Sequence, residues 1–107
     1  MWDTKFYDSE KKWFAEPRRI YLTRKQIQDA FDFFKKQYKL KQWKLRIAKA
    51  KSTGVCFWEK KLIVSSRRLS DLLHELGHAI TNTGHNNKHK KMMLKLYSEW
   101  IKGELYG

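Results

Sequence analysis

Apolar residues recur at intervals of three and four along residues 22–40, which is the spacing of one face of an α-helix. Thr23 followed by Gln26 has the sequence of a capping box, and Leu22 with Ile27 has the spacing of a hydrophobic staple. We therefore predict a helix from Thr23 to about Leu40 that buries one stripe and serves as a scaffold. The stripe consists of Ile27, Ala30, Phe31, Phe34 and Tyr38.

The next segments have the two-residue alternation of β-strands. Trp43, Leu45 and Ile47 occupy every second position, which predicts a strand with one side facing solvent. Gly54 interrupts this pattern. Residues 55–58 and 62–65 are rich in β-forming types and flank a polar segment at 59–61, as expected of a hairpin. We expect three short antiparallel strands, with residues 55–58 (Val55 to Trp58) at the edge of the sheet.

Two further helices are predicted after the sheet. Ser70 supplies an N-cap hydroxyl and Asp71 a first-turn carboxylate to a helix that ends near Thr81. Residues 82–84 are typical of a turn, and Asn86 or Asn87 can cap a last helix that Gly103 ends. The order of helix, small sheet, helix and helix predicts an α+β fold. The stripe of the last helix consists of Met92, Met93, Leu96, Trp100 and Ile101.

The composition limits the kind of protein this can be. A chain of 107 residues forms a single domain, 1–107, and 41% hydrophobic residues are enough for a packed core. A single cysteine, Cys56, excludes an internal disulfide and a zinc cluster built on cysteines. The first residues lack the pattern of a signal peptide, and no stretch approaches the ~20 apolar residues of a membrane span. We expect a soluble, cytoplasmic protein; the form of residues 1–17 stays open.

The charge balance is strongly basic. Lys and Arg number 24 against 11 Asp and Glu, a net charge of +13 that suits an acidic partner such as nucleic acid. The lysines of residues 35–51 are nevertheless spread along the first helix and the polar side of the first strand, and no RNA-binding signature accompanies them. A basic nucleic-acid-binding protein is therefore the alternative to the function that the histidines indicate.

All four histidines lie between residues 74 and 89, and His74-Glu75-Leu76-Gly77-His78 is an HExxH sequence. On a helix, residues four apart stand one turn above another, so both imidazoles can reach one Zn²⁺. Glu75 lies about 100° further round the helix, where its carboxylate can take a proton from a water on the metal and pass it to the leaving amine. This pattern predicts a zinc metalloendopeptidase that hydrolyses peptide bonds, with a peptide or protein as substrate.

A catalytic zinc site needs a third protein ligand. His85 is the first candidate, because it follows His78 by seven residues and Gly84 lets the chain turn back toward the metal. Glu99 on the last helix is the rival. His89 is the third choice, because it belongs equally to the packing stripe of that helix.

The sequence His74-Glu75-Leu76-Gly77-His78-Ala79-Ile80, with a helix and a small sheet before it and a helix after it, resembles the gluzincin type of zinc metallopeptidase. The length and the short path to His85 look most like the minigluzincins, soluble relatives of the catalytic domains of certain integral-membrane peptidases. That resemblance implies zinc ligands at His74, His78 and His85 and a general base and acid at Glu75. Residues 54–57 together with residues 84–92 also resemble SprT-like proteases, which place a third ligand histidine at the head of such a helix and act on DNA-bound proteins.

Minigluzincins are latent, with a C-terminal segment over the cleft, so the resemblance implies that residues 103–107 form a tail that blocks the site of a zymogen. Residues 55–58 are the expected rail for an extended substrate, since a peptide can add to an exposed sheet edge. Tyr97 is a candidate for stabilising the developing oxyanion, as are His89 and an arginine. The sequence does not indicate an oligomeric state.

Overall fold

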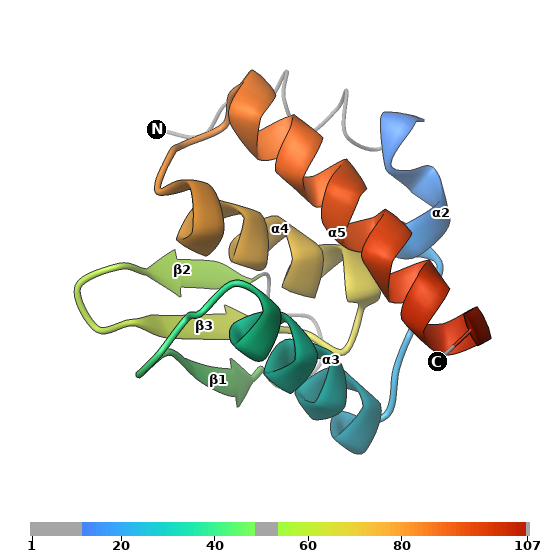
Figure 1. Cartoon of the computed structure of the whole chain (residues 1–107), viewed down its shortest axis with the longest axis horizontal. Coiled ribbons are helices and arrows are strands. Elements are labelled where there is room, and N and C mark those ends of the chain that lie inside the picture. Colours follow the sequence, from blue (N-terminus) through green and yellow to red (C-terminus); the bar gives the residue numbers. More distant parts are fainter. Residues whose placement is uncertain (1–11, 49–53, 107) are drawn as a thin grey trace.

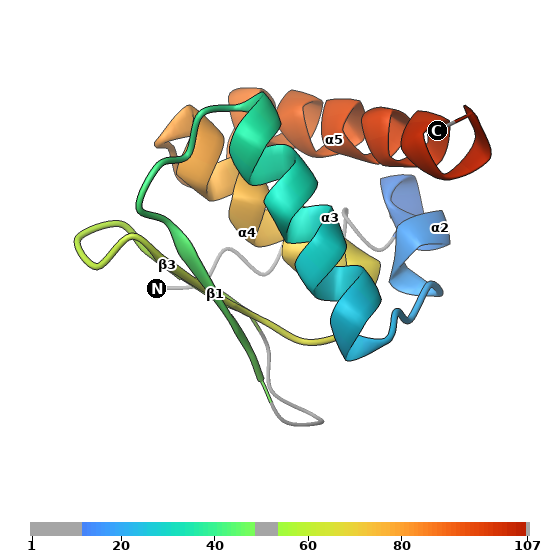
Figure 2. The ribbon, with the colours of Figure 1, turned by 60° about the horizontal axis from the view of Figure 1, so that its bottom comes forward.

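The computed structural model describes residues 12–48 and 54–106, and it has the predicted α+β fold. In Figure 1 the three strands lie side by side, α4 runs along them, and α5 crosses α4 on the side away from the sheet. Figure 2 shows α3, α4 and α5 on the same face of the sheet. The elements are α2 (Ala15–Arg18), α3 (Arg24–Gln37), β1 (Lys44–Ile47), β2 (Val55–Phe57), β3 (Leu62–Ser65), α4 (Leu69–Thr81) and α5 (Asn87–Tyr106).

The sheet is mixed, so the prediction of three antiparallel strands is wrong in part. The hairpin of β2 and β3 is antiparallel, with Cys56 opposite Ile63, as predicted. β1, however, pairs in parallel with the other side of β3, with Leu45 beside Ile63, and the strand order is β1-β3-β2. Alternation along a strand predicts which side chains are buried but not which neighbour it pairs with. Within residues 12–48 and 54–106, β2 is therefore an edge strand, as expected.

The first predicted helix is confirmed, with a shorter end. Thr23 and Gln26 form the reciprocal capping box at the start of α3, with the Gln26 backbone N–H donating to the Thr23 hydroxyl over 3.1 Å. The helix ends at Gln37 rather than near Leu40, and Lys39 then has a φ of 55°. A left-handed residue directly after the helix turns the chain toward β1.

The start of α4 differs from the prediction, because Ser70 is not its N-cap. The helix begins at Leu69, whose backbone N–H donates to the Ile20 carbonyl over 2.9 Å. The Arg68 backbone N–H donates to the hydroxyl of Ser66 over 3.1 Å. Partners outside the helix thus satisfy the first backbone donors two residues earlier than the sequence indicated, and Ser70 is buried inside the first turn.

Gly103 does not end α5, which continues to Tyr106. Among the described glycines none has a positive φ, and a glycine ends a helix through that left-handed conformation rather than by its presence alone. Residues 103–106 are therefore the last turn of α5, roughly 20 Å along the helix axis from His89. This arrangement gives no support to a tail that lies over the histidines, and residue 107 lies outside the described part of the chain.

The core surrounds α4. Leu69, Leu72, Leu73 and Leu76 are completely buried, between the sheet and α3 on one side and α5 on the other. Burial of this kind explains why α4 forms on a sequence with two histidines and a glycine, because packing of an apolar face contributes more to a helix than intrinsic propensity. In the part of the chain that the structure covers, no helix is both long and apolar enough to cross a bilayer.

Candidate metal centre

The histidines of the HExxH sequence lie on the last two turns of α4. His74 and His78 are 5% and 7% exposed, and their ring centroids are 4.8 Å apart. The Nε2 atoms of the two rings approach to 3.1 Å. The four-residue spacing therefore places both imidazoles on one side of the helix, as predicted.

His85 reaches the same place from the loop between α4 and α5. Asn82 ends α4 in the left-handed conformation, with φ 54°, and its backbone N–H donates to the His78 carbonyl over 2.8 Å. Asn86 then caps α5, because its side-chain oxygen accepts from the His89 backbone N–H over 3.0 Å. The prediction that Gly84 supplies the reversal is wrong, since a left-handed asparagine supplies it instead.

The Nε2 atoms of three histidines converge. His74 Nε2 lies 3.0 Å from His85 Nε2 and 3.1 Å from His78 Nε2, and ligand atoms of all three residues lie within 4.8 Å of one another. A tetrahedral ion with bonds of 2.0–2.1 Å would hold its nitrogens about 3.3 Å apart, which is within a few tenths of an ångström of the two distances measured from His74 Nε2. His74, His78 and His85 thus lie close enough together to bind a metal ion.

Hydrogen bonds alone account poorly for this convergence. His78 Nδ1 lies 2.8 Å from the Thr83 carbonyl, which can only accept, so the proton of a neutral His78 is on Nδ1 and its Nε2 carries a lone pair. An N–H on His74 Nε2 can point at His78 or at His85 but not at both. A cation in the centre would satisfy all three nitrogens, and the Thr83 carbonyl is the kind of partner that orients a ligating histidine.

Burial keeps the imidazoles of His74 and His89 neutral. The pKa of His74 is lowered to about 3, first by loss of solvent around the ring and then by His78, against an opposing effect of Asp71. The pKa of His89 is also lowered to about 3, mainly by burial and also by the neighbouring histidines, while its bond to the His74 carbonyl acts in the opposite direction. Neutral imidazole is the form that binds metals, so this environment favours ligation near neutral pH.

Glu75 is directed toward the edge strand. Its side chain is 6% exposed and lies against Gly54, directly before β2. A Cβ on Gly54 would be 2.9 Å from Glu75 Cγ and 3.0 Å from Glu75 Oε2. Burial and, less strongly, the negative charge of Glu75 raise the pKa of Cys56 on β2 to about 12. A buried carboxylate next to the candidate metal ligand His74 in the sequence therefore faces the strand on which a peptide could add.

The other candidates from the sequence lie elsewhere. Glu99 accepts a hydrogen bond from the Tyr38 hydroxyl over 2.7 Å. The pKa of Tyr38 is raised, most strongly by burial and then by the Glu99 carboxylate. Tyr97 packs edge-on against Phe14 of the N-terminal segment, with ring centroids 5.9 Å apart. Neither residue is brought to the histidines. His89 is beside them, but its Nε2 lies 2.8 Å from the backbone carbonyl of His74 rather than at the Nε2 cluster.

Trp58 is a neighbour of the site that the sequence reasoning treated only as part of the strand. It lies just after β2, is 42% exposed, and donates from Nε1 to the His78 carbonyl over 3.1 Å. Its ring meets that of His78 edge-on, with centroids 6.0 Å apart. An exposed tryptophan beside buried imidazoles could have been singled out by residue type, but its contact with His78 depends on how the hairpin packs on α4.

Comparison with known proteins adds no relative, because no protein-family model, curated protein or solved structure matches the chain. The function of the site is therefore inferred from the positions and chemistry of its residues.

Proposed function

We propose that this protein is a zinc-dependent metallopeptidase in which His74, His78 and His85 hold the metal and Glu75 handles the proton. The observation that carries the proposal is that His85 meets the two histidines of an HExxH helix whose glutamate is buried against the residue before an edge strand. This is the arrangement of donors that the resemblance to minigluzincins implies. SprT-like proteases share the same chemistry.

Zinc is the ion that the donor set favours. Three neutral imidazoles with one position left open are typical of catalytic zinc, whereas calcium and magnesium prefer oxygen ligands. When bound, zinc polarises a peptide carbonyl and brings the pKa of a bound water near 7.

The residues of the chain supply the remaining steps. The edge of β2 binds the substrate as an added strand through backbone hydrogen bonds. Glu75 accepts a proton from the attacking water while the oxygen of that water bonds to the scissile carbonyl carbon. The same carboxyl group then protonates the amine as the C–N bond breaks, so one water is consumed and one acid and one amine are formed. The burial of Glu75 excludes competing solvent from these transfers.

Metal content and hydrolysis of a quenched fluorescent peptide library, measured on the same samples, test the proposal. Wild type is expected to hold one zinc per chain and His85→Ala to lose it, whereas Glu75→Gln is expected to keep the zinc and lose about 10²-fold or more in kcat. Glu99→Gln is the matched control, since its carboxylate binds Tyr38, and it should keep both metal and activity. A wild type without metal after zinc loading, or full activity in Glu75→Gln, would overturn the proposal.

A second function has separate support in the surface around the β2–β3 turn. Phe57 and Trp58 are 40% and 42% exposed there, and Lys60 lies over the Phe57 ring at 5.5 Å. Lys61 continues the basic surface, whereas Lys49 and Lys51 lie outside the described residues. Exposed aromatics among lysines suit single-stranded nucleic acid, with the histidines then serving as a metal site without catalysis. Binding of an oligonucleotide that weakens steeply with salt would favour this function, and absence of binding at low salt would exclude it.

A further inference from the structure

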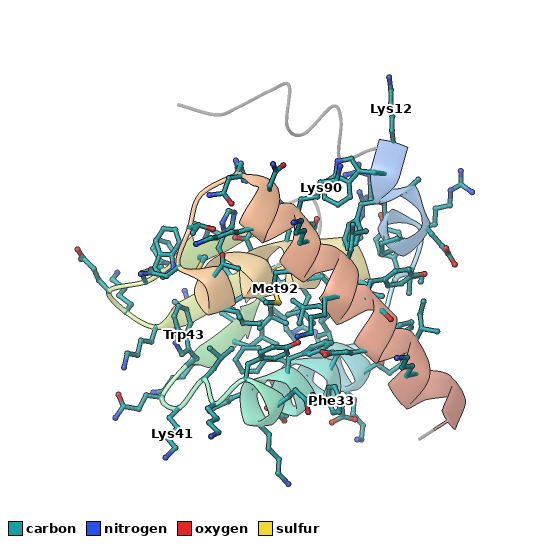
Figure 3. The ribbon with its side chains drawn as sticks, turned by 45° about the horizontal axis from the view of Figure 1, so that its top comes forward. Lys12, Phe33, Lys41, Trp43, Lys90 and Met92 are labelled. Carbon is teal, nitrogen blue, oxygen red and sulfur yellow. The ribbon has the colours of Figure 1, made fainter. Side chains whose placement is uncertain are left out.

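His89 is the one described histidine whose ring nitrogens stay outside the Nε2 cluster, yet it is completely buried beside that cluster. It lies in the first turn of α5, the helix on which Figure 3 labels Lys90 and Met92. Two contacts define its position. Its Nε2 donates to the backbone carbonyl of His74 over 2.8 Å, and its ring stacks on that of His78 with centroids 3.9 Å apart and an angle of 12° between planes.

The space for this ring comes from Gly77. A Cβ at Gly77 would lie 2.9 Å from His89 Cδ2 and 3.0 Å from His89 Nε2, closer than real Cβ contacts. The glycine within the HExxH sequence therefore leaves the gap that the imidazole fills between α4 and α5. An apolar ring could fill that volume equally well, so the polar nitrogen needs a separate explanation.

The contacts of His89 tie the first turn of α5 to the metal ligands. The hydrogen bond fixes this turn to the backbone of His74, and the stack restricts the plane of the His78 ring. The backbone N–H of His89 donates to the side-chain oxygen of the cap residue Asn86, and Asn86 directly follows His85. One buried side chain thus contacts two candidate ligands, and its ring centroid lies 5.6 Å from that of the third, His85.

We propose that His89 is a positioning residue for the metal site: it sets the ring plane of His78 and fixes the start of α5, directly after the loop that carries His85, without being a ligand. The inference rests on the proposed metal site but not on peptidase activity. Outer residues that orient ligating histidines typically change metal affinity by about 10–100-fold when they are removed.

Two substitutions separate the contacts. His89→Phe keeps a flat ring on His78 but loses the donor to His74, and His89→Gln keeps an amide donor but loses the stack. We expect each to weaken zinc binding by about 10-fold and to alter the visible spectrum of the Co²⁺-loaded protein, because the tetrahedral arrangement of three imidazoles is distorted. His89→Ala, which removes both contacts, is expected to weaken binding by about 100-fold.

Leu96→Ala is the matched control. Leu96 is also completely buried on α5, two turns further along, so its truncation lowers the melting temperature without removing a contact to the histidines. It should leave zinc affinity and the Co²⁺ spectrum unchanged at temperatures where the protein is folded. An equal loss of affinity in Leu96→Ala would show that His89 acts only through stability and would overturn the inference.

Three further results would decide against the inference. Zinc binding as in wild type for both His89→Phe and His89→Gln would show that neither contact positions the ligands. A Co²⁺ spectrum that loses one imidazole ligand in these variants would make His89 a ligand instead. Imidazole NMR of the metal-free protein keeps the test independent of the proposed function: the Nδ1–H form of His78 should dominate in wild type and become mixed in His89→Gln. An unchanged His78 would overturn the inference even if wild type bound no metal.

Discussion

Replacement of Gly54 by alanine should move the Glu75 carboxylate without touching the metal. The added methyl would lie 2.9 Å from Glu75 Cγ and 2.9 Å from the Val64 carbonyl, whereas carbon atoms pack at about 3.5–4.0 Å, so roughly 0.6–1 Å must be recovered. The contact with Glu75 is relieved by movement of that side chain, and the contact with the Val64 carbonyl by a small shift of β2 against β3, in which Val64 lies opposite Val55. Gly54 has a negative φ, and the backbone itself accepts alanine without strain.

If Glu75 has the proposed catalytic role, the expected result is a kcat about 10²-fold lower with unchanged zinc content, because a displacement of about 1 Å in a catalytic group is enough for a loss of that size. Overpacking should also cost about 1–3 kcal/mol of unfolding free energy. Peptide hydrolysis, zinc content and urea unfolding are measured on the same preparation. Gly84→Ala is the matched control, since a Cβ there meets nothing within 4 Å, and it should behave as wild type.

The double variant Gly54→Ala with Glu75→Gln isolates the cause. If Gly54 acts through Glu75, the double variant should be no slower than Glu75→Gln alone, because two changes to one catalytic group are not additive. A further 10²-fold loss in the double variant, or wild-type kcat in Gly54→Ala, would refute the reasoning.

Three further predictions follow from the same contacts. Gly77→Ala should lower the unfolding free energy measured in urea by about 1–3 kcal/mol, because the clash with His89 outweighs the roughly 1 kcal/mol that alanine gains over glycine in a helix. A net increase in stability would contradict the packing of His89 against Gly77. Glu75→Gln should speed alkylation of Cys56 several-fold at fixed pH, because loss of the negative charge lowers the thiol pKa; an unchanged rate would place the carboxylate elsewhere. His74 and His89 have pKa values of about 3 and stay neutral in the folded protein, whereas the same side chains in the unfolded chain take up protons below about pH 6.5. The unfolding free energy of metal-free protein should therefore fall as the pH is lowered from 6.5 to 3, by up to about 2–3 kcal/mol per pH unit. A flat profile would contradict the burial of these two histidines.

The sequence by itself determined the features that depend on local spacing. The capping box starts α3, the alternation of apolar residues gives the strands, and the four-residue interval places His74 and His78 on one side of a helix. Each of these follows from the geometry of residues close together in the chain, so no knowledge of distant contacts is needed. The three candidates for the third ligand were also available from the sequence.

Only the tertiary structure decided which distant residues meet. It brings His85 to the cluster, leaves Glu99 with Tyr38, and turns His89 toward the backbone of His74. It also pairs β1 with β3 in parallel, which makes β2 the edge strand facing Glu75 in the described part of the chain. These outcomes depend on how α4 packs between the sheet and α5, since residues far apart in sequence are selected by shape and burial rather than by spacing.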